Sequence, residues 1–143
     1  MVNQIIDSKG YLYLIYLITK DIYNLNIDCI EKLITQCKSK DNSPIELDMM
    51  YETVKNFRRE MIIKMISLEE YVDNMISIYA TEKPPRYIDE RAIYEFRYID
   101  YIITDMLKLD MIDFVKIHSF CIIIINTYNR LNYVNEINEI NKL

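Results

Sequence analysis

The stretch that decides the fold runs from residue 113 to residue 128 and reads DFVKIHSFCIIIINTY. Placed on a helix at about 100° per residue, its apolar side chains cover well over half of the circumference. A helix that is apolar nearly all round lies inside a fold, so we expect residues 110–128 to form a central helix. The four isoleucines at 122–125 are β-branched and would also suit a buried strand. We favour the helix because helical segments flank this run and no partner strand is evident.

Outward from this stretch, helical periodicity divides the chain into about seven segments. Two of them open with a capping box, in which a Ser hydroxyl and a Glu carboxylate take up free amide protons. These boxes read SPIE at residues 43–46 and SLEE at residues 67–70. Pro84 and Pro85 end the segment that begins at Ser67, because proline lacks an amide proton. The expected helices cover residues 11–23, 27–38, from 43, from 67, 89–108, 110–128 and from 131.

The totals of the chain limit its architecture. With 143 residues and 17.3 kDa it suits one domain over residues 1–143. It is 51% hydrophobic and 27% charged, so it can fold around a core. Gly10 is the only glycine, which argues against a hairpin-rich β architecture whose tight turns need glycine. We therefore predict an all-α, single-domain bundle of about seven helices around a central hydrophobic helix.

Charge and cysteine content exclude several classes of function. The net charge of −5 repels phosphate backbones and anionic lipids, so we expect no nucleic-acid binding. Near the C-terminus the longest uncharged run, residues 117–129, has 13 residues, whereas a membrane span needs about 20. Cys29, Cys37 and Cys121 are odd in number and form no C-x-x-C pair, so we expect no disulfides and a reducing compartment.

One expected helix carries aromatic residues on both sides. The apolar side of residues 89–108 includes Phe96 and Ile99, and Tyr94, Tyr98 and Tyr101 fall on the opposite side at spacings of four and three. A surface helix should be polar there. Either this helix is sandwiched between others or partly covered, or its tyrosine side meets a partner.

The sequence offers little that points to catalysis. General base chemistry commonly uses histidine, and His118 is the only one. Because its neighbours are apolar, we interpret it as a buried or half-buried packing residue. His118 and Cys121, at positions i and i+3, could share a metal, but a structural zinc needs four ligands and no second histidine exists. We predict no catalytic residue, no metal and no cofactor.

Two stretches resemble the poxviral Bcl-2-like family, small virus proteins that block host signalling or cell death. The first is MISLEEY at 65–71 through IYA at 78–80, which is similar to a family pattern of a capping Ser or Thr, an acidic pair and a closing tyrosine. The second is DFVKIHSF at 113–120 through Tyr128, which resembles the family's buried helix. The resemblance implies seven helices around a central one.

The chain also departs from that family. Cellular Bcl-2 proteins carry a Gly-Arg pair where a death-promoting helix docks, and this chain has only Gly10. It also lacks the hydrophobic C-terminal tail of the anti-death members. Within the resemblance, both departures favour a virus-encoded inhibitor of host innate immune signalling, in the NF-κB or interferon pathway. That function implies the host cytoplasm and a host signalling protein as partner.

The resemblance also implies dimers formed through helix faces, so the expected interface residues are Tyr94, Tyr98, Tyr101, Tyr11 and Tyr16. An alternative is an anti-apoptotic decoy that captures a death-promoting helix.

The decoy's groove would lie near Met61, Met65 and Tyr79, although these methionines suit core filling better than a groove. Two further alternatives stay open, a small enzyme or metal protein centred on His118 and an acidic phage or bacterial regulator.

Overall fold

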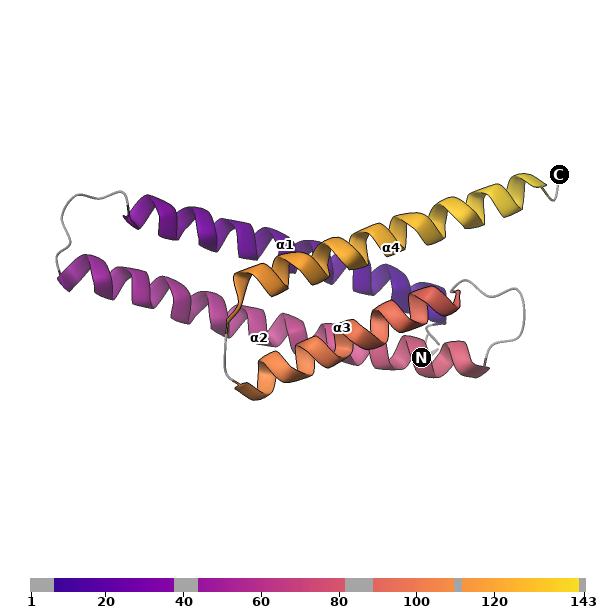
Figure 1. The fold of residues 1–143 in the computed structure, drawn as a ribbon, viewed down its shortest axis with the longest axis horizontal. Helices are drawn as coiled ribbons and strands as arrows, with labels where there is room; N and C mark the ends of the chain where they lie inside the picture. The colour runs from indigo at the N-terminus through magenta and orange to yellow at the C-terminus, as the bar shows by residue number, and fades with distance from the viewer. Residues whose placement is uncertain (1–6, 38–43, 82–88, 110–111, 142–143) are drawn as a thin grey trace, which may run out of the picture.

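The computed structural model describes residues 7–37, 44–81, 89–109 and 112–141, and four α-helices lie in these ranges (Figure 1). They are α1 (Ser8–Cys37), α2 (Pro44–Thr81), α3 (Glu90–Leu109) and α4 (Phe114–Asn141). No strand occurs in the described ranges, so the prediction of an all-α fold is confirmed. The isoleucine run at 122–125 lies inside α4 and not in a strand.

The helices form an up-and-down antiparallel bundle. α1 and α2 make a long hairpin, α3 runs back along α2, and α4 runs antiparallel to α1 (Figure 1). α1 packs along α2 and α4, and α3 packs along the same two helices. Of the diagonal pairs, α2 and α4 meet where the ring of Phe57 stacks on that of Phe114, with centroids 5.4 Å apart. The arrangement is therefore a ring of four neighbours, as in other four-helix bundles.

The prediction of seven helices is wrong, because three expected breaks do not occur. α1 joins the segments predicted at 11–23 and 27–38, α2 joins those from 43 and 67, and α4 joins those at 110–128 and from 131. No Gly or Pro stands at these joints, so nothing removes a backbone hydrogen bond. Ser67 was predicted to cap a helix, but its hydroxyl donates to the carbonyl of Ile63 at 3.3 Å inside α2.

α4 is not the central helix that its apolar sequence predicts. Ile117, Phe120 and Ile124 are buried, but Val115 is 75% exposed and Ile122 is also exposed. In a ring of four helices every member keeps one side open, whereas burial all round needs more neighbours. Because the sequence predicts too many helices, it also predicts too much burial for α4.

The core consists of one stripe from each helix. Phe96, Ile99 and Ile103 of α3 are fully buried, as their periodicity predicts. The helical spacing of Leu47, Met50, Val54, Phe57, Met61 and Met65 predicts one apolar stripe on α2. This stripe is buried at Phe57, Met61 and Met65 but not at Leu47, which is 60% exposed. The buried hydrophobic residues are Leu12, Ile15, Ile22, Cys29, Phe57, Met61, Met65, Leu68, Val72, Met75, Ala92, Phe96, Ile99, Ile103, Met106, Ile117, Phe120, Cys121, Ile124 and Leu131.

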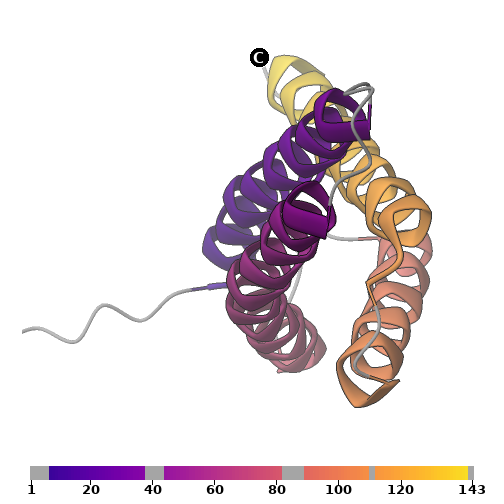
Figure 2. The same ribbon diagram turned by 90° about the vertical axis from the view of Figure 1, so that its left-hand side faces the viewer.

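Leu47 is exposed because the α1–α2 hairpin is longer than the other half of the bundle. α2 has 38 residues and α3 has 20, so at about 1.5 Å per residue their lengths differ by roughly 27 Å. Figure 1 shows the hairpin projecting past the end of α3 and the start of α4, and Figure 2 views the bundle from this projecting end. On the side that α3 covers further along, no described helix therefore packs against the N-terminal part of α2.

Aspartates begin three of the helices. The Oδ1 atom of Asp7 accepts the amide of Gly10, that of Asp89 accepts the amide of Ala92, both at 2.8 Å, and that of Asp113 accepts the amide of Lys116 at 3.0 Å. Each cap typically stabilises a helix by about 1 kcal/mol. Within the described ranges, no helix combines the length and apolar character that a bilayer crossing requires.

Candidate functional site

The outer side of α3 carries the most conspicuous exposed aromatic group of the molecule. Tyr94, Tyr98 and Tyr101 are 72%, 59% and 66% exposed. These three residues, here called the tyrosine face, are therefore not covered by another described helix. Of the two alternatives that the sequence left open, the sandwiched helix is wrong for the described part of the chain.

A groove adjoins the tyrosine face where α3 meets α4. It measures about 350 Å³, and its lining combines the apolar Ile102, Val115 and Ile123 with the charged Asp105 and Lys116. Tyr98 and Tyr101 also line it. A mainly apolar lining with a few polar groups is typical of a protein-binding surface.

Tyr11 and Tyr16, predicted to share this interface, join helices inside the molecule. The ring of Tyr16 stacks on that of Tyr128 of α4, with centroids 4.1 Å apart, and the ring centroid of Tyr11 lies 6.2 Å from that of Tyr71 of α2. α1 does not contact α3 in the described residues. The structure therefore does not bring these two tyrosines together with the tyrosine face.

The methionine groove proposed for capturing a death-promoting helix is absent at the predicted place. Met61 and Met65 are 0% and 2% exposed and belong to the core, and Tyr79 packs half-buried against it. The expectation that these methionines fill the core is confirmed.

His118 and Cys121 do not form a common site. His118 is exposed on α4, contrary to the predicted burial, and its ring centroid lies 5.4 Å from that of Tyr23. Cys121 is fully buried, which raises the pKa of its thiol to about 12. Burial also raises the pKa of the Cys29 thiol, although the charge of Lys32 opposes it. Neither buried thiol is a ready nucleophile or metal ligand.

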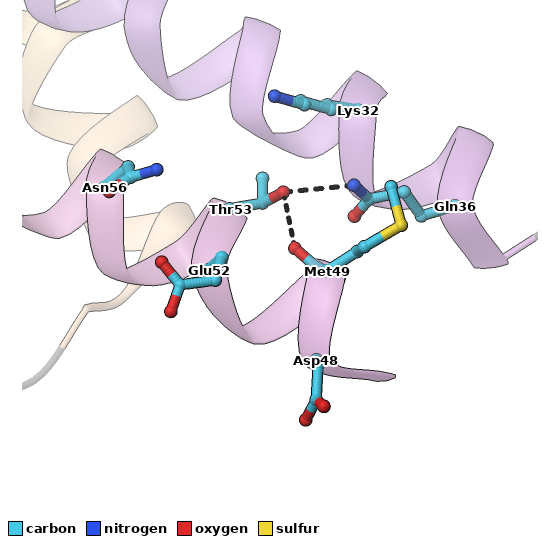
Figure 3. A pocket seen from close by; sticks show the side chains of 7 residues that line it. All are labelled: Lys32, Gln36, Asp48, Met49, Glu52, Thr53 and Asn56. Atoms are coloured by element: carbon cyan, nitrogen blue, oxygen red, sulfur yellow. Dashed lines mark hydrogen bonds between the residues drawn. The ribbon is translucent and has the colours of Figure 1, made fainter. Parts of the chain in front are cut away.

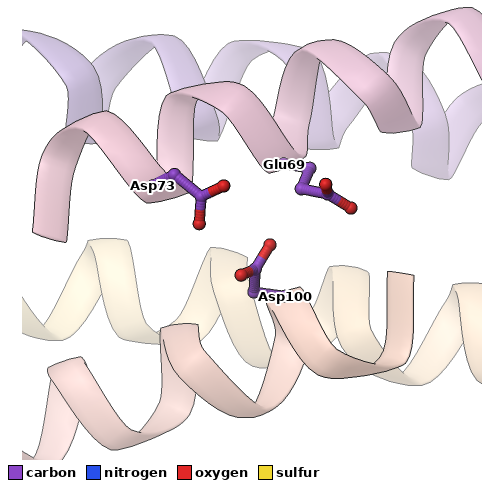
Figure 4. A group of neighbouring side chains, drawn as sticks. All are labelled: Glu69, Asp73 and Asp100. Carbon is purple, nitrogen blue, oxygen red and sulfur yellow. The ribbon is translucent and has the colours of Figure 1, made fainter. Parts of the chain in front are cut away.

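Three carboxylates meet between α2 and α3 at a place that the sequence did not reveal. Glu69 and Asp73 of α2 and Asp100 of α3 point toward one another (Figure 4), with one oxygen of each within 4.8 Å of the others. The hydroxyl of Thr104 donates to Glu69 at 3.0 Å. Glu69 had been interpreted as part of a capping box. Only the register between α2 and α3 brings it to Asp100.

This carboxylate cluster cannot be fully ionised at low cost. Burial, a hydrogen bond with Asp73 and the charges of Asp73 and Glu69 raise the pKa of Asp100 to about 7. The Oδ1 atom of Asp100 is buried and accepts no hydrogen bond from a described N–H or O–H. A proton on Asp100 lets this carboxyl donate a hydrogen bond to Asp73. Carboxylate oxygens also suit hard cations, but a proton on Asp100 relieves the repulsion among the three carboxylates without one.

A groove on the projecting hairpin is lined mainly by polar residues. It measures about 390 Å³ and lies between α1 and α2 (Figure 3). The amide of Gln36 donates to the hydroxyl of Thr53 at 3.0 Å, and that hydroxyl donates to the carbonyl of Met49 at 2.9 Å. The first of these bonds connects α1 to α2. The lining residues do not include a nucleophile paired with a base. We therefore assign the groove a structural role.

Comparison with known proteins adds no family. The chain matches no protein-family model, no curated protein and no solved structure. Any function must therefore be argued from the surfaces described above.

Proposed function

We propose that this chain acts by binding protein through the tyrosine face of α3 and the adjoining groove, and that the partner which this surface fits is a second copy of the chain. The observation that carries the proposal is the exposure of Tyr94, Tyr98 and Tyr101 on one side of one helix. Tyrosine offers a large contact area at a low entropic cost, which is why it is common at the centre of protein interfaces.

The charges around the tyrosine face favour the second copy. Arg91 stands seven residues before Tyr98 and Asp105 seven residues after it, so all three share one side of α3. Antiparallel pairing of two α3 helices about Tyr98 sets Arg91 of each copy opposite Asp105 of the other. Arg91 already pairs with Glu95 at 2.9 Å, but a guanidinium has five donors and can serve both carboxylates. A parallel pair would oppose like charges.

Sedimentation equilibrium of wild type and Tyr98→Ala tests this function. The wild type should dimerise at roughly micromolar concentration, and Tyr98→Ala should weaken the dimer about 30-fold, or about 2 kcal/mol, while the far-UV circular dichroism stays helical. Tyr13→Ala, which truncates an exposed tyrosine of α1, is the matched control and should leave the dimer unchanged. A wild type that stays monomeric at 100 μM or more would exclude the second copy as partner.

The charge argument has its own test. Arg91→Asp and Asp105→Arg should each weaken the dimer, because each places like charges opposite one another. The double variant should restore the dimer, because Asp at position 91 of one copy then faces Arg at position 105 of the other. Two single effects that simply add in the double variant would contradict antiparallel pairing about Tyr98.

A more specific prediction is that the chain is a virus protein that inhibits innate immune signalling in the host cytoplasm. It rests on the two stretches of sequence similarity, while the seven-helix bundle which that similarity implied is wrong. A dimeric protein-binding module is compatible with it. Co-precipitation with purified signalling adaptors and kinases, compared between wild type and Tyr98→Ala, is the test.

A further inference from the structure

A second surface with a distinct chemistry lies on the projecting part of α2. The side of α2 that meets α3 includes Glu69 and Asp73. Helical spacing continues this side toward the N-terminus through Ile62, Arg58, Lys55 and Tyr51. Because α3 is shorter than α2, it leaves this continuation uncovered (Figure 1).

The uncovered side contains a shallow groove that is both apolar and basic. Its volume is about 340 Å³, and it is lined by Tyr51, Val54, Lys55, Arg58, Arg59 and Ile62. We call it the basic α2 groove. Tyr51 is 68% exposed, and the neighbouring Ile63 and Ile66 are exposed as well. From Tyr51 to Ile66, apolar positions thus extend along about four turns of the helix.

The charge of the groove is opposite to that of the chain. Its lining contains three cations and no carboxylate, whereas the whole chain has a net charge of −5. Such a local excess attracts an anionic partner and holds it in one orientation. The apolar lining residues Tyr51, Val54 and Ile62 favour a partner whose apolar side chains are flanked by acids.

We propose that the basic α2 groove binds an acidic amphipathic helix of another protein, which lies on α2 as a continuation of α3. Two features carry the proposal, the charge complementarity and the continuity with the side that α3 already covers. This site is separate from the tyrosine face, so the chain would connect two partners.

The same chemistry could attract an anionic bilayer, but the structure favours a peptide. The surface is a groove along one helix, and the acidic Glu52 and Glu60 are exposed on α2 within a turn of it. These acids and the net charge of −5 oppose approach to a broad anionic surface.

The test uses the full chain and a synthetic peptide of 18 residues with leucines on one side and flanking glutamates. Fluorescence anisotropy should give a dissociation constant of roughly 1–50 μM at low salt, weakened about tenfold between 50 and 300 mM NaCl. The double variant Lys55→Glu with Arg59→Glu should weaken binding at least about tenfold. Lys20→Glu, a charge reversal on α1, is the matched control, and Tyr98→Ala should bind like wild type.

Three results would overturn the proposal. The first is no binding at 100 μM peptide. The second is equal affinity in the Lys55/Arg59 double variant and in Lys20→Glu, with all proteins helical by circular dichroism. The third is binding to phosphatidylserine vesicles that the double variant abolishes, without binding to the peptide. Because Tyr98→Ala is included, failure of the basic α2 groove and failure of the tyrosine face are distinguishable.

Discussion

The ionisation of Asp100 is costly to the fold. Glu69 and Asp73 face it from α2 and Thr104 lies beside it on α3, and no ion pair to the three carboxylates is formed by a described lysine or arginine. The pKa of Asp100 is raised from 3.8 to about 7 in the folded chain. Between these values the folded state holds more protons than the unfolded state, so stability falls as pH rises through this range.

Asp100→Asn should remove that part of the pH dependence. We expect the variant to gain about 1–2 kcal/mol over wild type at pH 8, a value discounted for solvent screening of this half-buried group, and to gain little at pH 4. Urea unfolding at pH 4, 6 and 8 measures the difference. Asp105→Asn, an exposed aspartate on the same helix, is the control. A constant difference between Asp100→Asn and wild type at all three values would contradict the raised pKa of Asp100.

The stability of a Met61 variant shows whether this side chain fills the core or lines an open groove. Because its side chain is fully buried among the four helices, Met61→Ala should lower the free energy of unfolding by about 2–5 kcal/mol. Met49→Ala, at an exposed methionine of the same helix, should cost less than about 1 kcal/mol. Chemical denaturation of both variants checks this. Equal, small losses would show that Met61 lines an open surface.

At the scale of the helices, a substitution at Ser67 distinguishes a single continuous α2 from two shorter helices that meet at this residue. An N-cap serine contributes about 1 kcal/mol, which Ser67→Ala would remove. Inside a continuous helix the same change should be neutral or stabilise by up to roughly 0.5 kcal/mol, because alanine is the better helix former. Thermal unfolding followed by circular dichroism decides between them, and Asp89→Ala, at a true cap, should lose about 1 kcal/mol or more.

The periodicity of the sequence predicts the buried sides of the helices well but not where the helices end. Phe96, Ile99 and Ile103 are buried as predicted, because 3.6-residue spacing follows from helix geometry alone. The break expected at Ser67 is absent because a capping motif is compatible with the start of a helix but does not force a helix to start there. Packing against α1 and α3 stabilises one uninterrupted helix there and overrides the local signal.

The sequence predicts the candidate sites only in part, because it specifies the side of a helix and not the neighbouring helices. Tyr94, Tyr98 and Tyr101 were identified from spacing, but their exposure depends on how many helices surround α3. The carboxylate cluster was not predictable, since Glu69 and Asp100 meet only through the register of α2 against α3. Local patterns specify a side of a helix, and tertiary packing decides what lies against it.

At the scale of the whole molecule, four helices of unequal length explain both proposed surfaces. A ring of four leaves the outer side of α3 open, and the short α3 leaves the N-terminal part of α2 without cover (Figure 1). A seven-helix bundle would bury both. The function proposed here therefore depends on the number of helices more than on any single residue.

Hydroxyl-radical footprinting of the tyrosines at two protein concentrations tests the central claim most directly, since it reports burial and association together. Tyr94, Tyr98 and Tyr101 should be oxidised quickly in dilute solution and protected at high concentration, whereas Tyr133, an exposed tyrosine of α4, should react equally in both. Protection of the three at every dilution would mean that α3 is covered within the chain. Equal reactivity at both concentrations would mean that the second copy does not bind there.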